Sequence, residues 1–248
     1  MVQAMAPVMR MLVTRPEPDA QATGERLQAL GIDYVAAPLL TRQNIHAHLP
    51  GPDGFAAMAL TSTNALRSLD DQDALEPFRH KPVFAVGDRT AHEARMLGFT
   101  EVMAADGTLD SLVTAIALAR LEGPVFYPCG RHLSGDLAHA LAPHGLMVAT
   151  VAVYDMVAET RLPEAASDLT QFDAALIYSR RTAEIFAELA APHIVPEERR
   201  HLPMLCLSEN VAAPLLSAHF SRVHLADHPS EEAMMALALA FSREQSRS

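Results

Sequence analysis

Several common features are missing from this chain of 248 residues, and each absence excludes a class of protein. There is no Trp, and aromatic residues make up only 5% of the chain, which argues against a stacking platform for bases or sugars. Only two cysteines are present, which excludes a disulfide scaffold and a structural zinc site and is typical of a reducing compartment. Basic residues are in the minority, with 19 Lys+Arg against 30 Asp+Glu, the opposite of the balance in nucleic-acid binders.

Long apolar runs, processing signals and standard catalytic motifs are missing as well. The longest apolar runs, such as MMALALAF (234–241), are far shorter than a membrane span, and the N-terminal MVQAMAPVMR lacks the apolar core of a signal peptide. The chain has no GxGxxG, P-loop or GxSxG pattern. We therefore expect a cytoplasmic monomer with neither a membrane nor a nucleic acid as partner.

Short apolar runs and helical patterns alternate along the whole chain. Continuous apolar runs are typical of parallel strands that are buried on both faces, and they occur at 11–14, 34–40, 56–61, 82–86, 101–105, 124–128, 146–154, 173–178, 203–207 and 222–226. Between them, Leu109 to Ile116 and Leu133 to Leu141 have helical spacing, and Thr108 and Ser230 are candidate N-caps. The alternation predicts an α/β protein with right-handed crossovers.

An internal repeat indicates two related domains. Phe99, Val102, Ala105 and Asp106 recur at a constant offset as Phe220, Val223, Ala226 and Asp227, and LTSTNALRSL (60–69) resembles IYSRRTAEIFAEL (177–189). The stretch beginning at PVFYPCG (124–130) resembles the N-terminal stretch beginning at MLVTRP (11–16), which relates the units by circular order.

The simplest arrangement is one α/β domain inserted into another. We expect two flavodoxin-like parallel-sheet domains, an outer one over 1–40 and 156–248 and an inner one over 41–155, joined by a two-stranded hinge. Pro38 within the run 34–40, and the length of the run 146–154, mark where the two strands cross, because Pro belongs at strand ends or edges. Chance similarity among Ala-rich βα units is the alternative explanation of the repeat.

Six loops follow predicted strands and are built mainly of Gly, Ser, Thr, Asn and Arg. They are 15–19, 61–64, 87–90, 128–131, 179–182 and 208–211. Ligands of open parallel sheets bind beyond the carboxyl ends of the strands, where helix N-termini present unpaired N–H groups. Each loop alone could be an ordinary helix cap, but together they predict an anion-binding cleft between the domains, with Arg15, Arg89, Arg131, Arg180 and Arg181 facing it.

Other reactive side chains allow two interpretations. His224 and His228, like His46 and His48, are too poorly placed to favour a metal site. Cys129 either has a lowered pKa near a helix N-terminus or is a buried, inert thiol. Tyr154 stands at the predicted crossing, where it either packs or finds a polar partner for its hydroxyl.

The order of these loops resembles that of the uroporphyrinogen-III synthases. VTRP (13–16) with LGIDYVAAPLL (30–40) is similar to the family's N-terminal strand, helix and crossing. The inner-domain signatures of the family resemble ALTSTNAL (59–66), VFAVGDRTA (83–91), FYPCG (126–130) and VYDMV (153–157). Those of its outer domain resemble ALIYSRRTAEIF (175–186), LCLSENVA (205–212) and HPSEEAMMALA (228–238).

The resemblance also implies roles for individual residues. Tyr154 matches the family's cleft tyrosine, which is proposed to help the substrate hydroxyl leave, and is our candidate catalytic residue. Thr90 matches the Thr of the VGxxT motif, and Ser179 opens the outer-domain loop. The full set of candidate substrate-binding residues is Arg15, Ser62, Thr63, Gly87, Arg89, Thr90, Gly130, Arg131, Ser179, Arg180 and Asn210. Many family members have Gly-x-Thr-Thr at 208–211, where this chain has SENV, so Asn210 alone is carried over there.

The family implies a reaction that needs no metal and no organic cofactor. Its substrate is hydroxymethylbilane, a linear tetrapyrrole with carboxylate side chains, which loses water, closes and inverts ring D to give uroporphyrinogen III. Catalysis then lies mainly in holding the chain ends and ring D, with stabilisation of a cationic intermediate. The rival hypothesis is a non-catalytic, two-lobed small-molecule binding protein, which has the same paired α/β lobes.

Overall fold

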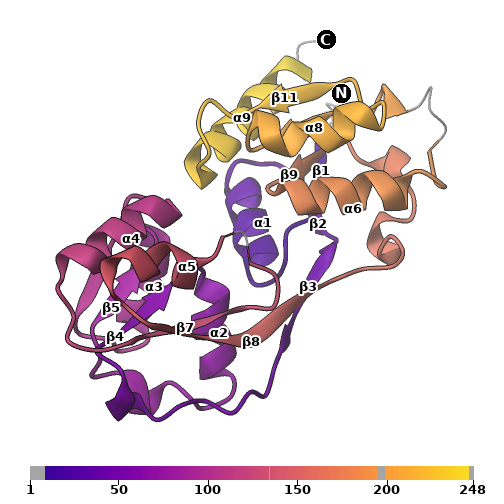
Figure 1. The fold of residues 1–248 in the computed structure, drawn as a ribbon. Coiled ribbons are helices and arrows are strands. Elements are labelled where there is room, and N and C mark those ends of the chain that lie inside the picture. Colours follow the sequence, from indigo (N-terminus) through magenta and orange to yellow (C-terminus); the bar gives the residue numbers. More distant parts are fainter. Residues whose placement is uncertain (1–8, 134, 195–198, 246–248) are drawn as a thin grey trace, which may run out of the picture. The chain divides into compact units, whose positions relative to one another are not determined.

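The computed structural model describes residues 9–133, 135–194 and 199–245. Contacts divide the chain into two compact units, unit 1 with Met1–Thr41 and Val157–Ser248, and unit 2 with Arg42–Met156. Each unit is built around a largely parallel sheet with helices on both faces (Figure 1). The predicted fold class, two parallel-sheet α/β domains, is confirmed.

The sheet of unit 1 has the flavodoxin-like strand order. Its strands are β1 (Arg10–Val13), β2 (Asp33–Ala36), β9 (Ala174–Ile177), β10 (Met204–Cys206) and β11 (Val223–Leu225), and they lie in the order β11-β10-β9-β1-β2 with every pair parallel. Numbered within the unit, this order is 2-1-3-4-5. The topological switch point therefore lies between β1 and β9.

The sheet of unit 2 has the same order with a circular start. Its strands are β4 (Ala57–Leu60), β5 (Val83–Ala85), β6 (Val102–Ala104), β7 (Val125–Gly130) and β8 (Val148–Ala158), plus β3 (Leu40–Asn44), in the order β3-β8-β7-β4-β5-β6. Counting from β7 gives 2-1-3-4-5 again, and the switch point lies between β7 and β4. The repeated Phe99 and Phe220 are both buried just before β6 and β11, the last strand of each order.

Helices cover both faces of each sheet. In unit 1, α1 (Asp19–Ala29) packs with α9 (Glu231–Gln245), and α6 (Arg180–Ala190) packs with α8 (Glu209–Ser217). In unit 2, α2 (Thr63–Asp70) and α3 (Asp88–Met96) bury their apolar faces in one cluster. The cluster on the other face is formed by α4 (Leu109–Leu118) and α5 (Leu137–Leu141).

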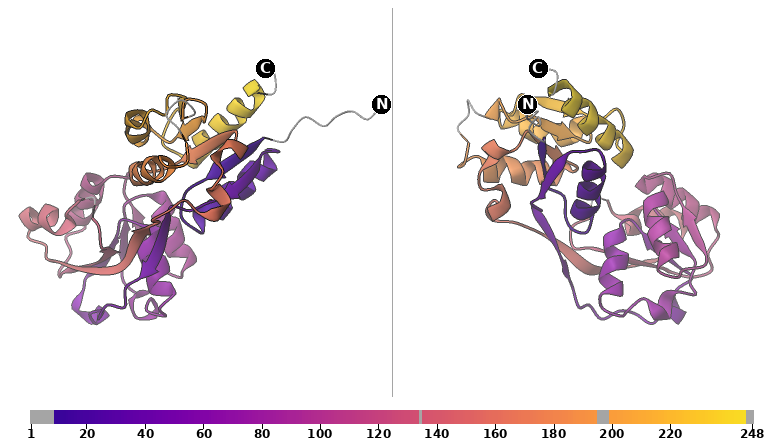
Figure 2. Two further views of the ribbon diagram at one scale, coloured as in Figure 1. Left: turned by 90° about the vertical axis from the view of Figure 1, so that its right-hand side faces the viewer. Right: turned by 180° about the vertical axis from the view of Figure 1, so that it is seen from behind.

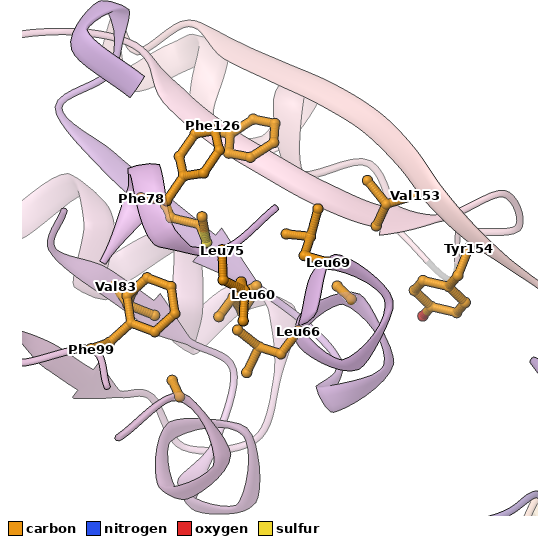
Figure 3. Packing of buried hydrophobic residues seen from close by; sticks show 13 residues of the cluster. Leu60, Leu66, Leu69, Leu75, Phe78, Val83, Phe99, Phe126, Val153 and Tyr154 are labelled. Carbon is orange, nitrogen blue, oxygen red and sulfur yellow. The ribbon is translucent and has the colours of Figure 1, made fainter. Parts of the chain in front are cut away.

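The core of unit 2 on the α2 and α3 side is a cluster of buried side chains. Phe126 stacks on Phe78 with ring centroids 4.9 Å apart and contacts Phe55 at 5.5 Å. Figure 3 shows Val153 and Tyr154 at one end of this cluster, away from the two stacked rings. The hydroxyl end of Tyr154 thus belongs to the margin of the core.

Two strands carry the chain between the units. The apolar pattern predicts one strand over 34–40, but the structure divides this run into β2 and β3, with Pro38 in the gap because Pro cannot donate to a ladder. The long strand β8 continues past unit 2 to Ala158, as Figure 2 shows. β3 and β8 run antiparallel, since Ile45 N–H donates to the Val153 carbonyl and Glu159 N–H donates to the Leu39 carbonyl.

One local prediction needs correction and two are confirmed. The spacing predicts that Leu133 shares a helix with Leu137 and Leu141, but Leu133 is exposed and lies before the helix, which begins after its N-cap Asp136. Thr108 is confirmed as an N-cap, because its hydroxyl accepts from Ser111 N–H in a capping box. The Ser230 hydroxyl accepts from Ala233 N–H at the start of α9, as an N-cap does.

Candidate functional site

The candidate site residues of unit 2 gather at the carboxyl ends of its two central strands. Ser62 and Thr63 follow β4, and Arg131 follows β7, so they flank the switch point where open α/β sheets bind ligands. The sequence predicts a loop over 128–131, but Pro128, Cys129 and Gly130 are the buried last residues of β7. The apolar environment of β7 extends the strand by these residues.

Ser62 caps the helix that begins at the switch point. Its hydroxyl oxygen accepts from Asn64 N–H at 3.2 Å, and Thr63, the first residue of α2, is buried. Ser179 of unit 1 has the same position, since it follows β9 and caps α6 by accepting from Thr182 N–H. The sequence repeat that pairs these two serines therefore corresponds to one structural position in both sheets.

Tyr154 lies on β8, beside the end of β7. It is only 9% exposed, and the Ser62 side chain lies near its hydroxyl. Burial raises the pKa of the Tyr154 phenol above its usual value, while the neighbouring Ser62 side chain and the Arg42 guanidinium act in the opposite direction. The phenol is therefore a protonated donor at neutral pH.

A second phenol lies next to this position. Tyr127 of β7 is buried, and its hydroxyl shares a hydrogen bond of 2.9 Å with the Thr61 hydroxyl. Burial also raises the pKa of Tyr127. Neither Thr61 nor Tyr127 is among the candidates selected from the sequence, although Thr61 lies within the loop 61–64 and Tyr127 within the FYPCG stretch.

The loop that opens α3 carries three more candidates. Gly87 is the N-cap and has an extended backbone, so α3 begins without a capping side chain. Arg89 is exposed in the first turn, whereas Thr90 is 6% exposed. The N–H groups of this helix start and the exposed Arg89 side chain are suited to an anion. Arg131 is also exposed, and its guanidinium donates to Asp155 at 3.0 Å.

In unit 1 the switch point is filled by a cluster around Arg15. The Arg15 guanidinium donates to Glu231, Asp19 and Thr23, and it stacks over the Tyr178 ring at 4.1 Å. The Tyr178 hydroxyl donates to Glu231 at 3.2 Å. Burial, with the charge of Glu231 second, raises the pKa of Tyr178. Two carboxylates therefore already occupy the Arg15 guanidinium, which ties β1, α1, β9 and α9 together.

Sequence patterns give partial signals for two of these partners of Arg15. Asp19 is four residues after Arg15 at the start of a helix, a spacing that favours an ion pair. Glu231 follows the predicted N-cap Ser230, where acidic residues are favoured by the helix dipole, but its partner lies 216 residues away in sequence. Only the strand order brings the start of α9 to the end of β1.

The remaining candidates of unit 1 lie close together. Arg180, the first residue of α6, donates to the Asn210 side-chain oxygen of α8 at 3.1 Å and to Glu184 at 2.9 Å. Arg180, Arg181 and Asn210 are exposed, and Ser179 is partly exposed. The loops after β9 and β10 thus present a shared polar surface, as their positions after neighbouring strands predict.

The two cysteines are buried in strands, which decides between the two interpretations of Cys129. It is 2% exposed, and burial raises its pKa to about 11. Burial raises the pKa of Cys206 to about 12. The inert thiol is thus the correct interpretation of Cys129, since thiolate is the reactive form.

We predict that neither thiol reacts with an aromatic disulfide reagent in the native protein at mildly alkaline pH. Both pKa values lie far above this range, and both side chains are shielded. Two equivalents should react once denaturant is added, which is the internal control. Fast labelling of Cys129 before unfolding would contradict the prediction.

No cluster of three or more His, Cys, Asp or Glu side chains with metal-binding geometry occurs in residues 9–133, 135–194 and 199–245. Within the same residues, no helix is long and apolar enough to cross a membrane.

Two α/β units of 2-1-3-4-5 strand order, each with polar helix starts at its switch point, define the class of two-domain flavodoxin-like proteins. A family model described as uroporphyrinogen-III synthase HemD matches residues 21–236. The chain belongs to the uroporphyrinogen-III synthase HemD family. Members of this family are the cyclising lyases of haem biosynthesis and act on hydroxymethylbilane, which places the function of this chain in tetrapyrrole biosynthesis.

Solved structures agree with this fold. The chain is similar to uroporphyrinogen-III synthetase from Helicobacter pylori 26695, with 17% identity, a TM-score of 0.67 and coverage of 94% of this chain and 99% of that one. It is also similar to a mutant uroporphyrinogen III synthase from Thermus thermophilus, with 17% identity, a TM-score of 0.56 and coverage of 97% and 100%. No curated protein sequence matches the chain. The family match favours the synthase over the two-lobed binding protein.

Proposed function

We propose that this chain converts hydroxymethylbilane to uroporphyrinogen III, with Tyr154 as the acid that protonates the leaving hydroxyl. The observation that carries the proposal is the position of Tyr154 in a chain that belongs to this family over residues 21–236. The phenol lies beside the switch point of unit 2, near Ser62, which is the N-cap of α2. Switch points are where ligands of such sheets bind.

The reaction requires one acid and a protein that holds the substrate in position. The bilane hydroxyl leaves as water when it receives a proton, and the neighbouring pyrrole nitrogen stabilises the cationic azafulvene that remains. Tyr154, whose phenol is protonated at neutral pH, is suited to this donation. Closure then has two outcomes, and the enzyme must hold ring D so that attack through a spiro intermediate precedes simple closure.

We propose that polar groups at the helix starts and loops of each unit bind the substrate carboxylates. In unit 2 these are the N-terminal N–H groups of α3 after Gly87, with Thr90 and the side chains of Arg89 and Arg131. In unit 1 they are Ser179, Arg180 and Asn210 at the starts of α6 and α8. Helix N-termini and Arg side chains are the groups that bind carboxylates best.

Arg15 is proposed to act on the substrate only indirectly. Its side chain is 12% exposed, and its guanidinium is already paired with Asp19 and Glu231. Its role in this proposal is to hold the end of β1 and the start of α9 in place, so that the neighbouring Ser179 loop keeps its position after β9.

The proposal is tested by supplying hydroxymethylbilane and separating the oxidised porphyrin isomers. We expect the type III isomer to dominate with the protein, against the type I isomer formed by spontaneous closure without it. Heat-denatured protein is the control for carry-over of other activities. If only type I product forms, the proposed function is wrong.

Compartment and assembly form part of the same proposal. Two buried, unpaired thiols are typical of a protein from a reducing compartment, which supports a place in the cytoplasm. We propose that the chain acts as a monomer, with no nucleic acid as partner. Light scattering during size-exclusion chromatography should give a mass near 26.8 kDa.

A further inference from the structure

The side chain of Tyr154 does not point where a regular strand would place it. Successive residues of a strand face opposite sides of the sheet. Val153 and Tyr154 nevertheless both pack into the cluster on the α2 and α3 side, as Figure 3 shows. In the pairing of β7 with β8, Cys129 pairs with Ala152, and the next pair is Gly130 with Tyr154. Val153 is thus the extra residue of a β-bulge, and the direction of the Tyr154 side chain depends on how the Val153 peptide group is held.

A buried hydroxyl on α2 holds the carbonyl of this extra residue. The Ser68 hydroxyl lies 2.6 Å from the Val153 carbonyl oxygen, and Ser68 is 0% exposed. A carbonyl can only accept, so Ser68 is the donor. The same carbonyl accepts at 2.8 Å from the N–H of Ile45, the residue directly after β3. The Val153 peptide group is therefore bonded both to the neighbouring strand and to the helix above it.

Gln72 leaves the Ser68 hydroxyl a single direction for its proton. The Gln72 side-chain amide donates to the Ser68 hydroxyl oxygen at 3.1 Å and to the Ser68 carbonyl at 2.8 Å. Hydroxyls within helices commonly bond the carbonyl four residues earlier, as Thr114 and Ser217 do. Ser68 instead donates to a strand residue 85 positions away in sequence. The side chain thus serves a contact between elements and not its own helix.

The matching position of unit 1 carries an apolar residue. α2 and α6 begin after the equivalent caps Ser62 and Ser179, and six residues after each cap stand Ser68 and Ile185. The strand pairs differ in the same way, because β1 and β2 pair in unbroken register whereas the register of β7 and β8 shifts. The buried hydroxyl and the β-bulge therefore occur together, in the unit that contains Tyr154.

The Tyr154 ring lies so close to β7 that a small backbone shift changes its place. A Cβ atom on Gly130 would lie 2.9 Å from Cζ and 3.1 Å from the hydroxyl oxygen of Tyr154. The Tyr154 carbonyl accepts from Arg131 N–H at 2.8 Å, which fixes the backbone on one side of the ring. On the other side the Val153 carbonyl is held by Ser68. Loss of the Ser68 bond should therefore move the phenol relative to the end of β7.

We propose that Ser68 is a positioning residue for Tyr154. Its hydroxyl ties the β-bulge to α2, the helix that begins at the switch point of unit 2, and so holds the phenol in place beside that helix start. Because Ser68 is fully buried, it acts through the Val153 carbonyl and does not contact the substrate. The inference rests on the proposed function, which gives the phenol its part in the reaction.

The kinetic test is a double-mutant cycle of Ser68→Ala and Tyr154→Phe. We expect Ser68→Ala to lower kcat about tenfold and to leave KM within about twofold, since a misplaced acid impairs proton donation and not binding. The double variant should be no slower than Tyr154→Phe alone, because the group that Ser68 positions is then absent. A rise in KM at unchanged kcat, or losses that multiply in the double variant, would overturn the proposal.

Ser68→Thr separates positioning from stability. This variant keeps the hydroxyl but adds a methyl group at a fully buried site, so its unfolding midpoint should fall below that of the wild type. Its kcat should nevertheless stay within about threefold of the wild type, because the bond to the Val153 carbonyl is kept. A loss of kcat as large as in Ser68→Ala would show that activity follows packing and not the hydroxyl.

A second readout does not depend on activity. The chain has only four Tyr, so selective labelling of the Tyr Cζ carbon with carbon-13 gives four signals, which Tyr→Phe variants assign. We expect Ser68→Ala to shift the Tyr154 signal more than the Tyr127 signal of the same unit, and Ser68→Thr to keep the Tyr154 signal near its wild-type position.

The matched control is a buried hydroxyl of unit 1. Thr14 is 0% exposed and donates to the Leu176 carbonyl at 2.9 Å, so Thr14→Val removes a comparable bond and should leave the Tyr154 signal unchanged. An unshifted Tyr154 signal in Ser68→Ala would overturn the inference even where the wild type makes the type III isomer. A wild type that makes only type I product would refute the proposed function, while a shifted signal would still show that Ser68 holds the ring.

Discussion

Replacing Tyr154 by Phe should lower kcat by about one to two orders of magnitude and leave KM nearly unchanged, the size expected for loss of a general acid. The variant keeps the ring that packs at the margin of the unit 2 core and removes only the hydroxyl. Single-turnover formation of the type III isomer measures the change. Turnover equal to the wild type would rule out Tyr154 as the acid.

The pH dependence supplies a second check on the same group. Because burial raises the pKa of Tyr154, the phenol stays protonated through neutral and moderately alkaline pH. An acid loses activity as it deprotonates, so kcat should fall only above this raised pKa, and this alkaline limb should be absent from Tyr154→Phe. Tyr127→Phe is the matched control, since it removes a neighbouring buried phenol that is bonded to Thr61 and should leave kcat within about twofold of the wild type.

Replacing Phe126 by Ala should destabilise unit 2 by about 3–5 kcal/mol. The Phe126 ring is 1% exposed, stacks on Phe78 and contacts Phe55, so its removal leaves a cavity that the neighbouring strands cannot close. Urea unfolding should be followed by circular dichroism and by the carbon-13 signals of Tyr127 in unit 2 and Tyr178 in unit 1. The Tyr127 transition should move to lower urea.

The control for this variant is a truncation at the surface. Leu118 is 76% exposed, so Leu118→Ala should change stability by no more than about 0.5 kcal/mol. Phe186 of unit 1 is 0% exposed and packs with Phe220, and Phe186→Ala should act first on the Tyr178 transition. An unchanged Tyr127 transition in Phe126→Ala would show that this ring does not hold the core of unit 2.

Apolar periodicity is sufficient to locate the strands buried on both faces, because such strands require continuous apolar runs. It cannot locate β3, whose sequence LTRQN is polar after Leu40 and whose side chains after that residue alternate between exposed and partly buried. Pairing with β8, a property of the three-dimensional structure, makes those residues a strand. Helical spacing likewise predicts that Leu133 belongs to α5. The helix begins only after its N-cap Asp136, so Leu133 lies outside it.

The candidate site is predictable as a set of loops but not as a set of contacts. Position after a strand is sufficient to place Ser62, Ser179 and Asn210 at the carboxyl edges. Ser62 and Tyr154 come from distant parts of unit 2, and their proximity depends on a β-bulge between β7 and β8 that no local pattern predicts. Arg15 is a case in which the loop composition misleads. The composition predicts that Arg15 faces a ligand, but its guanidinium is paired with Glu231 from the far end of the chain.

The strand order indicates that the two halves of the chain are related by duplication. In sequence order, β1, β2, β4, β5 and β6 take the places of strands 1 to 5 of this order, and β7 to β11 take the same five places a second time. Each sheet, however, takes its first two strands from one set and its last three from the other. The chain therefore has the form of a tandem duplication whose two halves have exchanged strands, as in a domain swap within one polypeptide. Neither half contains a complete sheet, so a nick near residues 121–123 would leave two fragments that must associate to rebuild either core.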